Sequence, residues 1–207
     1  MDSDEVRREW EERSGEYSPA YYAHYGADDT SESIHRILEE HLDRDAAVLE
    51  LGCSSGRHLA HLHDHGFDDL SGIELNADAF DVMAETYPDL AETGTFYHAA
   101  IEDVVGDLAD DTFDAVFSVE TLQHLPPDAE WVYGELARIT SGLLVTVENE
   151  GGPDADGGPD ADVNYVRDEF PLYYRDWNDI FTAQGLTEIE TVSGDRDTLR
   201  AFRSPPE

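Results

Sequence analysis

The residues best suited to chemistry lie in one glycine-containing stretch, AAVLELGCSSGRHLAHL, at positions 46–62. A short apolar run ends at Gly52, Gly56 follows, and leucines and histidines then recur at helical spacing. A strand that turns through glycines into a helix points backbone N–H groups at a ligand, which is typical of sites for nucleotide-like molecules. Ser54 stands where the second glycine of a dinucleotide-binding loop is expected, so the stretch departs from the G-x-G-x-x-G pattern.

Two glutamates around this loop narrow the choice of ligand. Glu50 precedes the loop, where a carboxylate can meet a cationic amine, and Glu74 ends the next apolar segment. A carboxylate at the second position accepts both ribose hydroxyls and disfavours a 2′-phosphate. The pair therefore predicts an adenosine-type ligand with a free ribose and a positive charge. In so acidic a chain, each glutamate could also be an ordinary exposed residue at a strand end.

The elements that must position these residues alternate between strand and helix from residue 47 to about 148. This alternation predicts a doubly wound α/β sheet with the ligand at the carboxyl ends of its strands. The expected strands are 46–51, 70–75, 95–101, 113–119 and 142–148. The expected helices are 28–42 (capped by a Ser or Thr within 30–33), 56–66, 76–88 (capped by Asn76) and 126–140.

The last quarter of the chain predicts one more helix and two more strands. The helix is expected at 171–185, and a Gly-Asp turn joins the strands 186–194 and 198–204 into an antiparallel pair. Before them, the hexapeptide GGPDAD occurs twice in residues 151–162, which predicts a flexible acidic loop beside the ligand-binding face.

The composition predicts one acid-coated domain. The chain has 207 residues, 40% of them hydrophobic, which is enough for one core. Its 49 acidic residues oppose 12 basic ones, all arginine, and the formal net charge of −37 repels phosphate backbones and anionic membranes. We therefore expect neither nucleic acid nor a membrane as partner, and infer adaptation to a salt-rich cytoplasm, where salt screens the repulsion. A single cysteine, Cys53, and the lack of a signal-peptide pattern also favour a cytoplasmic location.

Several ordered motifs resemble one family. VLELGCSSG and GIELN are similar to the first two motifs of class I S-adenosylmethionine-dependent methyltransferases, and FDAVFSVETLQHLPP and ELARITSGLLVTVE to those of the fourth and fifth strands. The resemblance, over roughly residues 31–203, implies a Rossmann-like seven-stranded sheet, mostly parallel with an antiparallel C-terminal hairpin. It implies S-adenosylmethionine as cofactor, S-adenosylhomocysteine as product and a small molecule as methyl acceptor. Residues 1–30 would form a lid and 31–207 the methyltransferase domain, including the acidic loop 150–162.

The resemblance also implies roles for individual residues. The glycine loop would line the methionyl part of the cofactor, Glu74 would hold the ribose, and Leu75 would pack on the adenine. At the adenine edge, Ala100 departs from the acid common in the family, so Glu102 or Asp103 is expected to meet adenine N6. The backbone carbonyl of Ser118 would face the methionyl amine. The cofactor-binding set is Glu50, Gly52, Cys53, Ser54, Gly56, Glu74, Leu75, Ala100, Ile101, Glu102 and Ser118.

The loop after the fourth strand, residues 120–124, is expected to face the methyl group. The positively charged sulfur of S-adenosylmethionine already activates the methyl group for transfer, so the protein mainly aligns the acceptor and excludes water. A general base helps only when the acceptor carries a proton that it must lose. His124 is the best candidate base, ahead of Glu120, Glu148 and the N-terminal tyrosines, although it could instead fix the loop. The substrate pocket is expected in residues 10–30, 120–127 and 149–175, with candidate substrate-binding residues Tyr21, Tyr25, Gln123, Arg167 and Arg175.

Structural alternatives stay open for several of these residues. The arginines could pair with nearby acids, the tyrosines could be core packing, and Cys53 is more simply a small packing residue than a reactive thiol. A polar helix face explains the histidines of 58–65 better than a metal site, so no metal is predicted. Two other functions remain: an NAD-dependent oxidoreductase, which the loop spacing and the absence of lysine disfavour, and a methyltransferase-like scaffold subunit without turnover.

Overall fold

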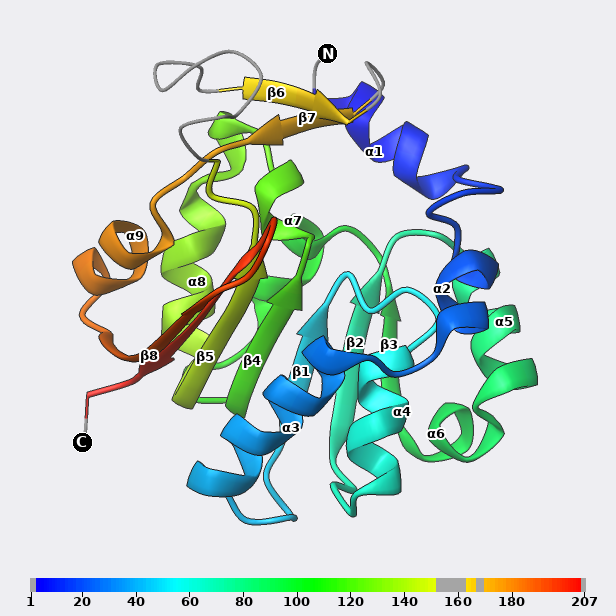
Figure 1. Ribbon diagram of the computed structural model, residues 1–207, viewed down its shortest axis with the longest axis horizontal. Helices are drawn as coiled ribbons and strands as arrows, with labels where there is room; N and C mark the ends of the chain where they lie inside the picture. The colour runs from blue at the N-terminus through cyan, green and yellow to red at the C-terminus, as the bar shows by residue number, and fades with distance from the viewer. Residues whose placement is uncertain (1–2, 152–162, 167–169, 206–207) are drawn as a thin grey trace.

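The computed structural model describes residues 3–151, 163–166 and 170–205. Its centre is a seven-stranded sheet in the order β3-β2-β1-β4-β5-β9-β8 (Figure 1). The order reverses between β1 and β4, and ligands bind at such a switch point in open α/β sheets. The strands are β1 Val48–Leu51, β2 Leu70–Glu74, β3 Thr95–His98, β4 Phe113–Val119, β5 Thr140–Glu148, β8 Thr187–Ser193 and β9 Thr198–Arg203.

Strand direction confirms the predicted fold class. β1 to β5 are parallel to one another, whereas β9 runs antiparallel to both β5 and β8. β1 is buried along its whole length, as a parallel strand covered on both faces must be. β8 lies at the edge of the sheet and alternates between half-buried and exposed residues over its first half, as a strand covered on one face does. The side-chain pattern of each strand therefore matches its place in the sheet.

Two hydrophobic cores hold helices on opposite faces of the sheet. Val48 of β1 packs into the first core, and its neighbour Leu49 points the other way into the second, because side chains alternate along a strand. The first core contains residues of α3 Asp29–His41, α4 Arg57–Asp64, α5 Asp78–Thr86 and α6 Pro88–Thr93. The second contains residues of α7 Ile101–Val104, α8 Trp131–Ile139 and α9 Trp177–Ala183.

The N-terminal cap of α3 differs from the prediction. Asp28 accepts hydrogen bonds from the backbone nitrogens of Thr30 and Ser31, so the cap precedes the expected range 30–33. Ser31 completes the cap, because its hydroxyl accepts a hydrogen bond from the backbone nitrogen of Asp28 at 3.2 Å. A carboxylate is as good an acceptor here as a hydroxyl, and sequence alone does not separate the two.

Several other elements are also shorter than predicted, three of them with a visible local reason or a clear change of boundary. The expected helix 76–88 ends at Thr86, and a separate helix, α6, starts at Pro88, where a proline fits the first turn. The expected helix 126–140 is helical from Trp131, after a 3₁₀ turn over Pro127–Ala129. The third strand ends at His98 rather than at residue 101.

The predicted helix 171–185 is wrong in its first half. Residues Phe170–Tyr173 form β7, which pairs antiparallel with β6 Val163–Val166 in a second, two-stranded sheet. The helix α9 begins only at Trp177, where Asp176 caps it by accepting from the backbone nitrogen of Asp179 at 3.0 Å. Pairing with β6 satisfies the backbone of β7, and this distant partner cannot be read from local residue spacing.

The N-terminal segment lies near the carboxyl ends of the parallel strands. It forms α1 Ser3–Glu11 and α2 Pro19–Tyr25, and α1 lies beside β7 at this end of the molecule (Figure 1). The acidic GGPDAD repeats, apart from Gly151, and Arg167 fall outside the described residues.

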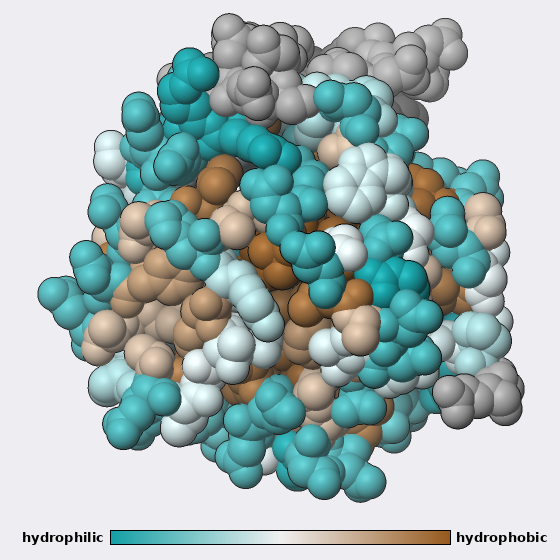
Figure 2. Space-filling model, turned by 180° about the vertical axis from the view of Figure 1, so that it is seen from behind, coloured by the Kyte–Doolittle hydropathy of each residue, from teal (hydrophilic) through white to brown (hydrophobic). Residues whose placement is uncertain are grey.

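The surface carries hydrophilic side chains on many elements. Figure 2 shows them spread over the face opposite to that of Figure 1, with hydrophobic side chains collected in its middle. This distribution agrees with acids placed throughout the folded domain rather than in one tail. Over the part of the chain that the structure describes, no helix has both the length and the apolar character needed to cross a lipid bilayer.

Candidate active site

A cavity opens at the carboxyl ends of β1, β2 and β4, where the topology predicts a ligand site. The N-terminal segment covers it with Trp10, Tyr17 and Tyr22. Segments that are far apart in the sequence therefore line the same cavity. The sequence-predicted residues that line it are Glu50, Gly52, Cys53, Ser54, Glu74, Leu75, Ala100, Ile101, Glu102, Glu120 and His124.

The glycine loop needs its glycines for two separate reasons. Gly52 has φ +65°, and a Cβ atom there would lie 2.4 Å from Oγ1 of Thr121. The loop therefore has to pass directly beside the segment that follows β4. Gly56 has φ +79° at the start of α4 and packs against Met83 and Leu90, so it shapes the loop without lining the cavity. Residues other than glycine rarely adopt the positive φ angles of these two positions.

Glu74 ties the glycine loop after β1 to the segment that follows β2. Its Oε2 accepts from the backbone nitrogen of Ser54 at 2.8 Å, and its Oε1 from that of Asn76 at 2.7 Å. Burial raises the pKa of this carboxyl, while the backbone N–H groups act in the opposite direction. Each carboxylate oxygen still has a second lone pair, so Glu74 can accept ligand hydroxyls as well.

Glu50 is a buried carboxyl group at the cavity, and one of its oxygens lacks a hydrogen bond from the described residues. It is 2% exposed, and its Oε2 has no hydrogen-bonding partner among the described residues. Burial raises its pKa well above the ordinary value, and the nearby Arg57 opposes that shift. A buried carboxylate without a partner is costly, so this oxygen is suited to receive a donor from a ligand.

Cys53 is a packing residue in this loop. A Cβ atom on Gly72 would lie 2.6 Å from its sulfur, which shows how closely the thiol packs on β2. Burial raises the pKa of the thiol well above its usual value, and Glu50 adds to the shift. A thiol with a raised pKa is unreactive, in agreement with the simpler of the two interpretations of this cysteine.

The region expected to meet adenine begins α7. Ala100 and Ile101 are buried and line the cavity with Glu102. Glu102 forms an ion pair with Arg7 of α1 at 3.0 Å, and Asp103 lies 3.7 Å from the same guanidinium without lining the cavity. Of the two acids considered for adenine N6, only Glu102 therefore reaches the cavity.

Glu148 positions the loop after β4. This fully buried carboxylate accepts from Ser118 Oγ at 2.5 Å and from the backbone nitrogens of Leu122 and Gln123 at 3.1 and 3.2 Å. A further backbone donor, from Thr121, lies at 3.3 Å. Burial raises the pKa of Glu148 to about 7 against the effect of these donors. The sequence ranked it among candidate bases, but it does not line the cavity and instead holds the turn that carries His124.

His124 lies at the cavity wall, and both of its ring nitrogens have neighbours. Its Nδ1–H donates to the carbonyl of Pro171 at 2.9 Å, which leaves the lone pair on Nε2. The amide nitrogen of Gln123 lies 3.4 Å from that Nε2, and the Trp10 ring lies 5.0 Å from the imidazole between centroids. Burial lowers the pKa of His124, so the ring is neutral at pH 7. Glu120 also lines the cavity but is ion-paired with Arg196.

The four candidate substrate-binding residues that the structure describes lie away from the cavity lining: Tyr21, Tyr25, Gln123 and Arg175. Tyr25 is 62% exposed and its ring packs beside Tyr21, at 4.9 Å between centroids. Gln123 accepts from the backbone nitrogen of Asn149 at 2.7 Å. Arg175 donates to the carbonyl of Leu125 at 2.7 Å and packs over aromatic rings, so it is a structural residue in this arrangement.

Asn76 is a residue whose second role the sequence did not indicate. Its Oδ1 accepts from the backbone nitrogen of Asp78 at 3.0 Å, as a helix cap does. Its Nδ2 donates to the carbonyls of Trp10 and Arg13, at 3.3 and 3.1 Å. The side chain thus fastens the N-terminal cover to the end of β2. The capping signal was visible in the sequence, but the partners more than sixty positions away were not.

His58 gives the stability of the fold a pH dependence that can be measured. It is buried, shares a 2.7 Å hydrogen bond with Ser31, and burial lowers its pKa to about 3, with Arg57 adding to the effect. The unfolded chain takes up a proton near pH 6.5 and the folded chain does not, so stability falls as the pH falls. From pH 6.5 to about 5.5, this one group should cost about 1 kcal/mol.

Urea unfolding at constant KCl concentration measures this contribution. The wild type should lose about 1 kcal/mol more than His58→Gln over that interval. His24→Gln, at an exposed histidine, should keep the wild-type slope. Equal slopes for wild type and His58→Gln would show that His58 is protonated in the folded state.

Known proteins share both the sequence pattern and the fold. A family model described as a methyltransferase domain matches residues 48–141. An O-methyltransferase of Pyrenophora dematioidea is 26% identical over 114 residues, which are 53% of this chain and 42% of that protein. The chain thus matches less than half the length of this curated relative.

Two solved structures illustrate the similarity of the fold. Geranyl diphosphate C-methyltransferase from Streptomyces coelicolor superposes with a TM-score of 0.70 and 14% identity, over 98% of each chain. A Burkholderia thailandensis enzyme, 1,6-didemethyltoxoflavin-N1-methyltransferase, superposes with a TM-score of 0.67 and 16% identity, over 85% of this chain and 78% of that one. The chain therefore contains a segment that matches a methyltransferase domain, and its seven-stranded sheet has the fold of these two methyltransferases.

Proposed function

We propose that this protein transfers a methyl group from S-adenosylmethionine to a small-molecule acceptor. The observation that carries the proposal is the unpartnered Oε2 of Glu50, which is buried at the cavity beside a glycine loop. A ligand that brings an ammonium group and a ribose satisfies Glu50 and Glu74 together. A dinucleotide would bring a pyrophosphate to the same two carboxylates and is disfavoured by their charge.

The residues of the cavity fit the cofactor part by part. Glu50 would receive the methionyl ammonium, Glu74 the ribose hydroxyls, and Leu75 and Ile101 would pack on the adenine. When bound, S-adenosylmethionine supplies a methyl group on a positively charged sulfur. The protein's own contribution is to align an acceptor with that group and to exclude water.

The N-terminal segment supports a small acceptor. Residues 1–30 act as a lid in this proposal, and Trp10, Tyr17 and Tyr22 form the aromatic side of the acceptor pocket. The two similar enzymes named above act on geranyl diphosphate and 1,6-didemethyltoxoflavin, according to their names, and both are small molecules. His124, with a neutral ring and a lone pair on Nε2, is the side chain that we propose accepts a proton from the acceptor.

Thermal unfolding in molar KCl tests the proposal. S-adenosylmethionine and S-adenosylhomocysteine should each raise the unfolding midpoint in a concentration-dependent way, whereas NAD should not, because only a ligand of the native state stabilises it by mass action. His124→Gln should keep both shifts, and lose turnover once an acceptor is found. A shift with NAD alone would favour an oxidoreductase, and no shift with any of the three would favour a scaffold subunit.

A further inference from the structure

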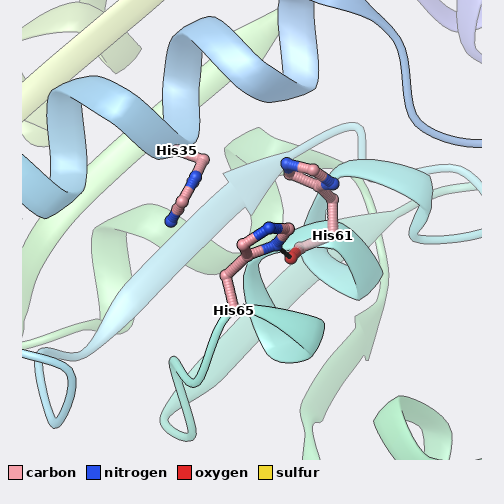
Figure 3. A group of neighbouring side chains, drawn as sticks. All are labelled: His35, His61 and His65. Atoms are coloured by element: carbon pink, nitrogen blue, oxygen red, sulfur yellow. Dashed lines mark hydrogen bonds between the residues drawn. The ribbon is translucent and has the colours of Figure 1, made fainter.

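Three histidines from two helices meet on the first-core face of the sheet, away from the cavity. His35 comes from α3, His61 from α4, and His65 follows the end of α4. Each offers one ring nitrogen, and these atoms all lie within 4.8 Å of one another (Figure 3). The sequence placed His61 and His65 on one helix face, but it did not indicate that His35 joins them.

Two histidines of this cluster each have a ring nitrogen available to bind a metal ion. His61 is 9% exposed, and its Nε2 has no hydrogen-bonding partner among the residues described. His65 donates its Nδ1–H to the carbonyl of His61 at 2.7 Å, so its lone pair is on Nε2. A metal-bound histidine commonly makes such a bond with its other nitrogen, because the carbonyl fixes the tautomer and the ring orientation.

The charge around the cluster suits a cation. Burial and the neighbouring His65 lower the pKa of His35, which favours the neutral ring that a metal requires. Two carboxylates stand at the edge: Glu32 Oε2 is 3.6 Å from His61 Nε2, and Glu39 Oε2 is 3.9 Å from His35 Nε2. The formal net charge of −37 adds a long-range attraction for divalent cations.

Arg44 competes with a metal at this position. Its Nη1 lies 3.3 Å from His35 Nε2, so a metal ion would displace that N–H group. The guanidinium has alternative contacts that let it withdraw, since it is ion-paired with Glu39 and lies over the Phe67 ring at 4.9 Å. The contact also indicates that His35 Nε2 carries its lone pair, because a guanidinium can only donate.

We propose that His35, His61 and His65 bind one Zn²⁺ ion that joins α3 to α4. Zn²⁺ takes imidazole nitrogens at about 2.0–2.1 Å in tetrahedral geometry, which puts neighbouring nitrogens about 3.4 Å apart. Small changes in the side-chain torsions of His35 and His61 toward His65 reduce the separation. Water or the Glu32 carboxylate completes the four ligands. His58 of α4 lines the cavity, but none of the three proposed ligands does, so the ion has a structural role in this proposal.

Metal titration of the untagged, chelator-treated chain in molar KCl tests this site. Zn²⁺ should bind with a stoichiometry of one by calorimetry and raise the unfolding midpoint. Co²⁺ should give the absorption bands of a tetrahedral nitrogen site at the same stoichiometry. His65→Ala, which changes an exposed ring, should weaken Zn²⁺ binding at least about 100-fold. His35→Ala should do the same.

His63→Ala is the matched control, because His63 lies on the same helix but outside the cluster. It should bind Zn²⁺ as tightly as the wild type. The site is refuted by the absence of saturable binding, or by equal affinities of wild type and His65→Ala. Neither readout needs cofactor or turnover, so its result is independent of the proposed methyltransferase activity.

Discussion

Glu74→Ala should abolish the thermal stabilisation by S-adenosylmethionine at concentrations that saturate the wild type. The substitution removes the carboxylate that we propose holds both ribose hydroxyls. It also removes the acceptor that fixes the backbone nitrogens of Ser54 in the glycine loop and of Asn76 after β2. Loss of charge-assisted hydrogen bonds on this scale corresponds to about 3 kcal/mol of binding free energy, or about 100-fold in Kd.

The measurement is a titration of the unfolding midpoint in molar KCl with cofactor and with S-adenosylhomocysteine. Glu85→Ala, at an exposed glutamate of α5, is the control and should give the wild-type shift. The midpoint without ligand shows whether the variant is folded. A folded Glu74→Ala protein with an unchanged shift would mean that the cofactor does not lie against β2.

Glu148→Gln should destabilise the fold by about 3 kcal/mol and loosen the turn that carries His124. The carboxylate oxygens together accept from Ser118 and from backbone nitrogens of the following turn. An amide replaces one of these oxygens by an NH₂ group, which cannot accept and faces other donors. Each buried donor that loses its partner costs about 1–3 kcal/mol.

Urea unfolding at constant KCl concentration measures this loss. Glu92→Gln, at an exposed position of α6, makes the same chemical change without the buried donors and should stay within about 0.5 kcal/mol of the wild type. A loss of less than about 1 kcal/mol in Glu148→Gln would mean that the buried carboxyl is protonated and makes few of these bonds.

The local signals of the sequence were enough to predict the sheet and the glycine loop. Gly52 and Gly56 adopt a positive φ, which glycine allows because it has no Cβ atom. The two glycines therefore mark the loop in the sequence without reference to distant residues. The apolar run of β1 and the Gly-Asp turn before β9 likewise act over a few residues. Alternation of such segments restricts the topology to few choices, and the observed strand order is one of them.

Tertiary structure decided which side chains reach the cavity. Arg175 is near the predicted pocket in sequence, but it turns to the carbonyl of Leu125 and to aromatic rings. Of the three tyrosines on the short helix α2, Tyr22 lines the cavity and Tyr21 and Tyr25 do not, because the orientation of the helix turns one of its sides to the cavity. Tyr17, which precedes α2, also lines the cavity. Residue type alone could not show which tyrosines within residues 17–25 face the cavity.

The sequence by itself determined the fold class, the position of the glycine loop and the two carboxylates beside it, because each depends on residues close together in the chain. Only the tertiary structure decided that Glu148 holds the turn before His124, that Asn76 fastens the N-terminal cover, and that His35 meets the histidines of α4. These contacts join segments 25 or more positions apart. They depend on how helices and strands pack together, which is set by the whole core rather than by any local pattern.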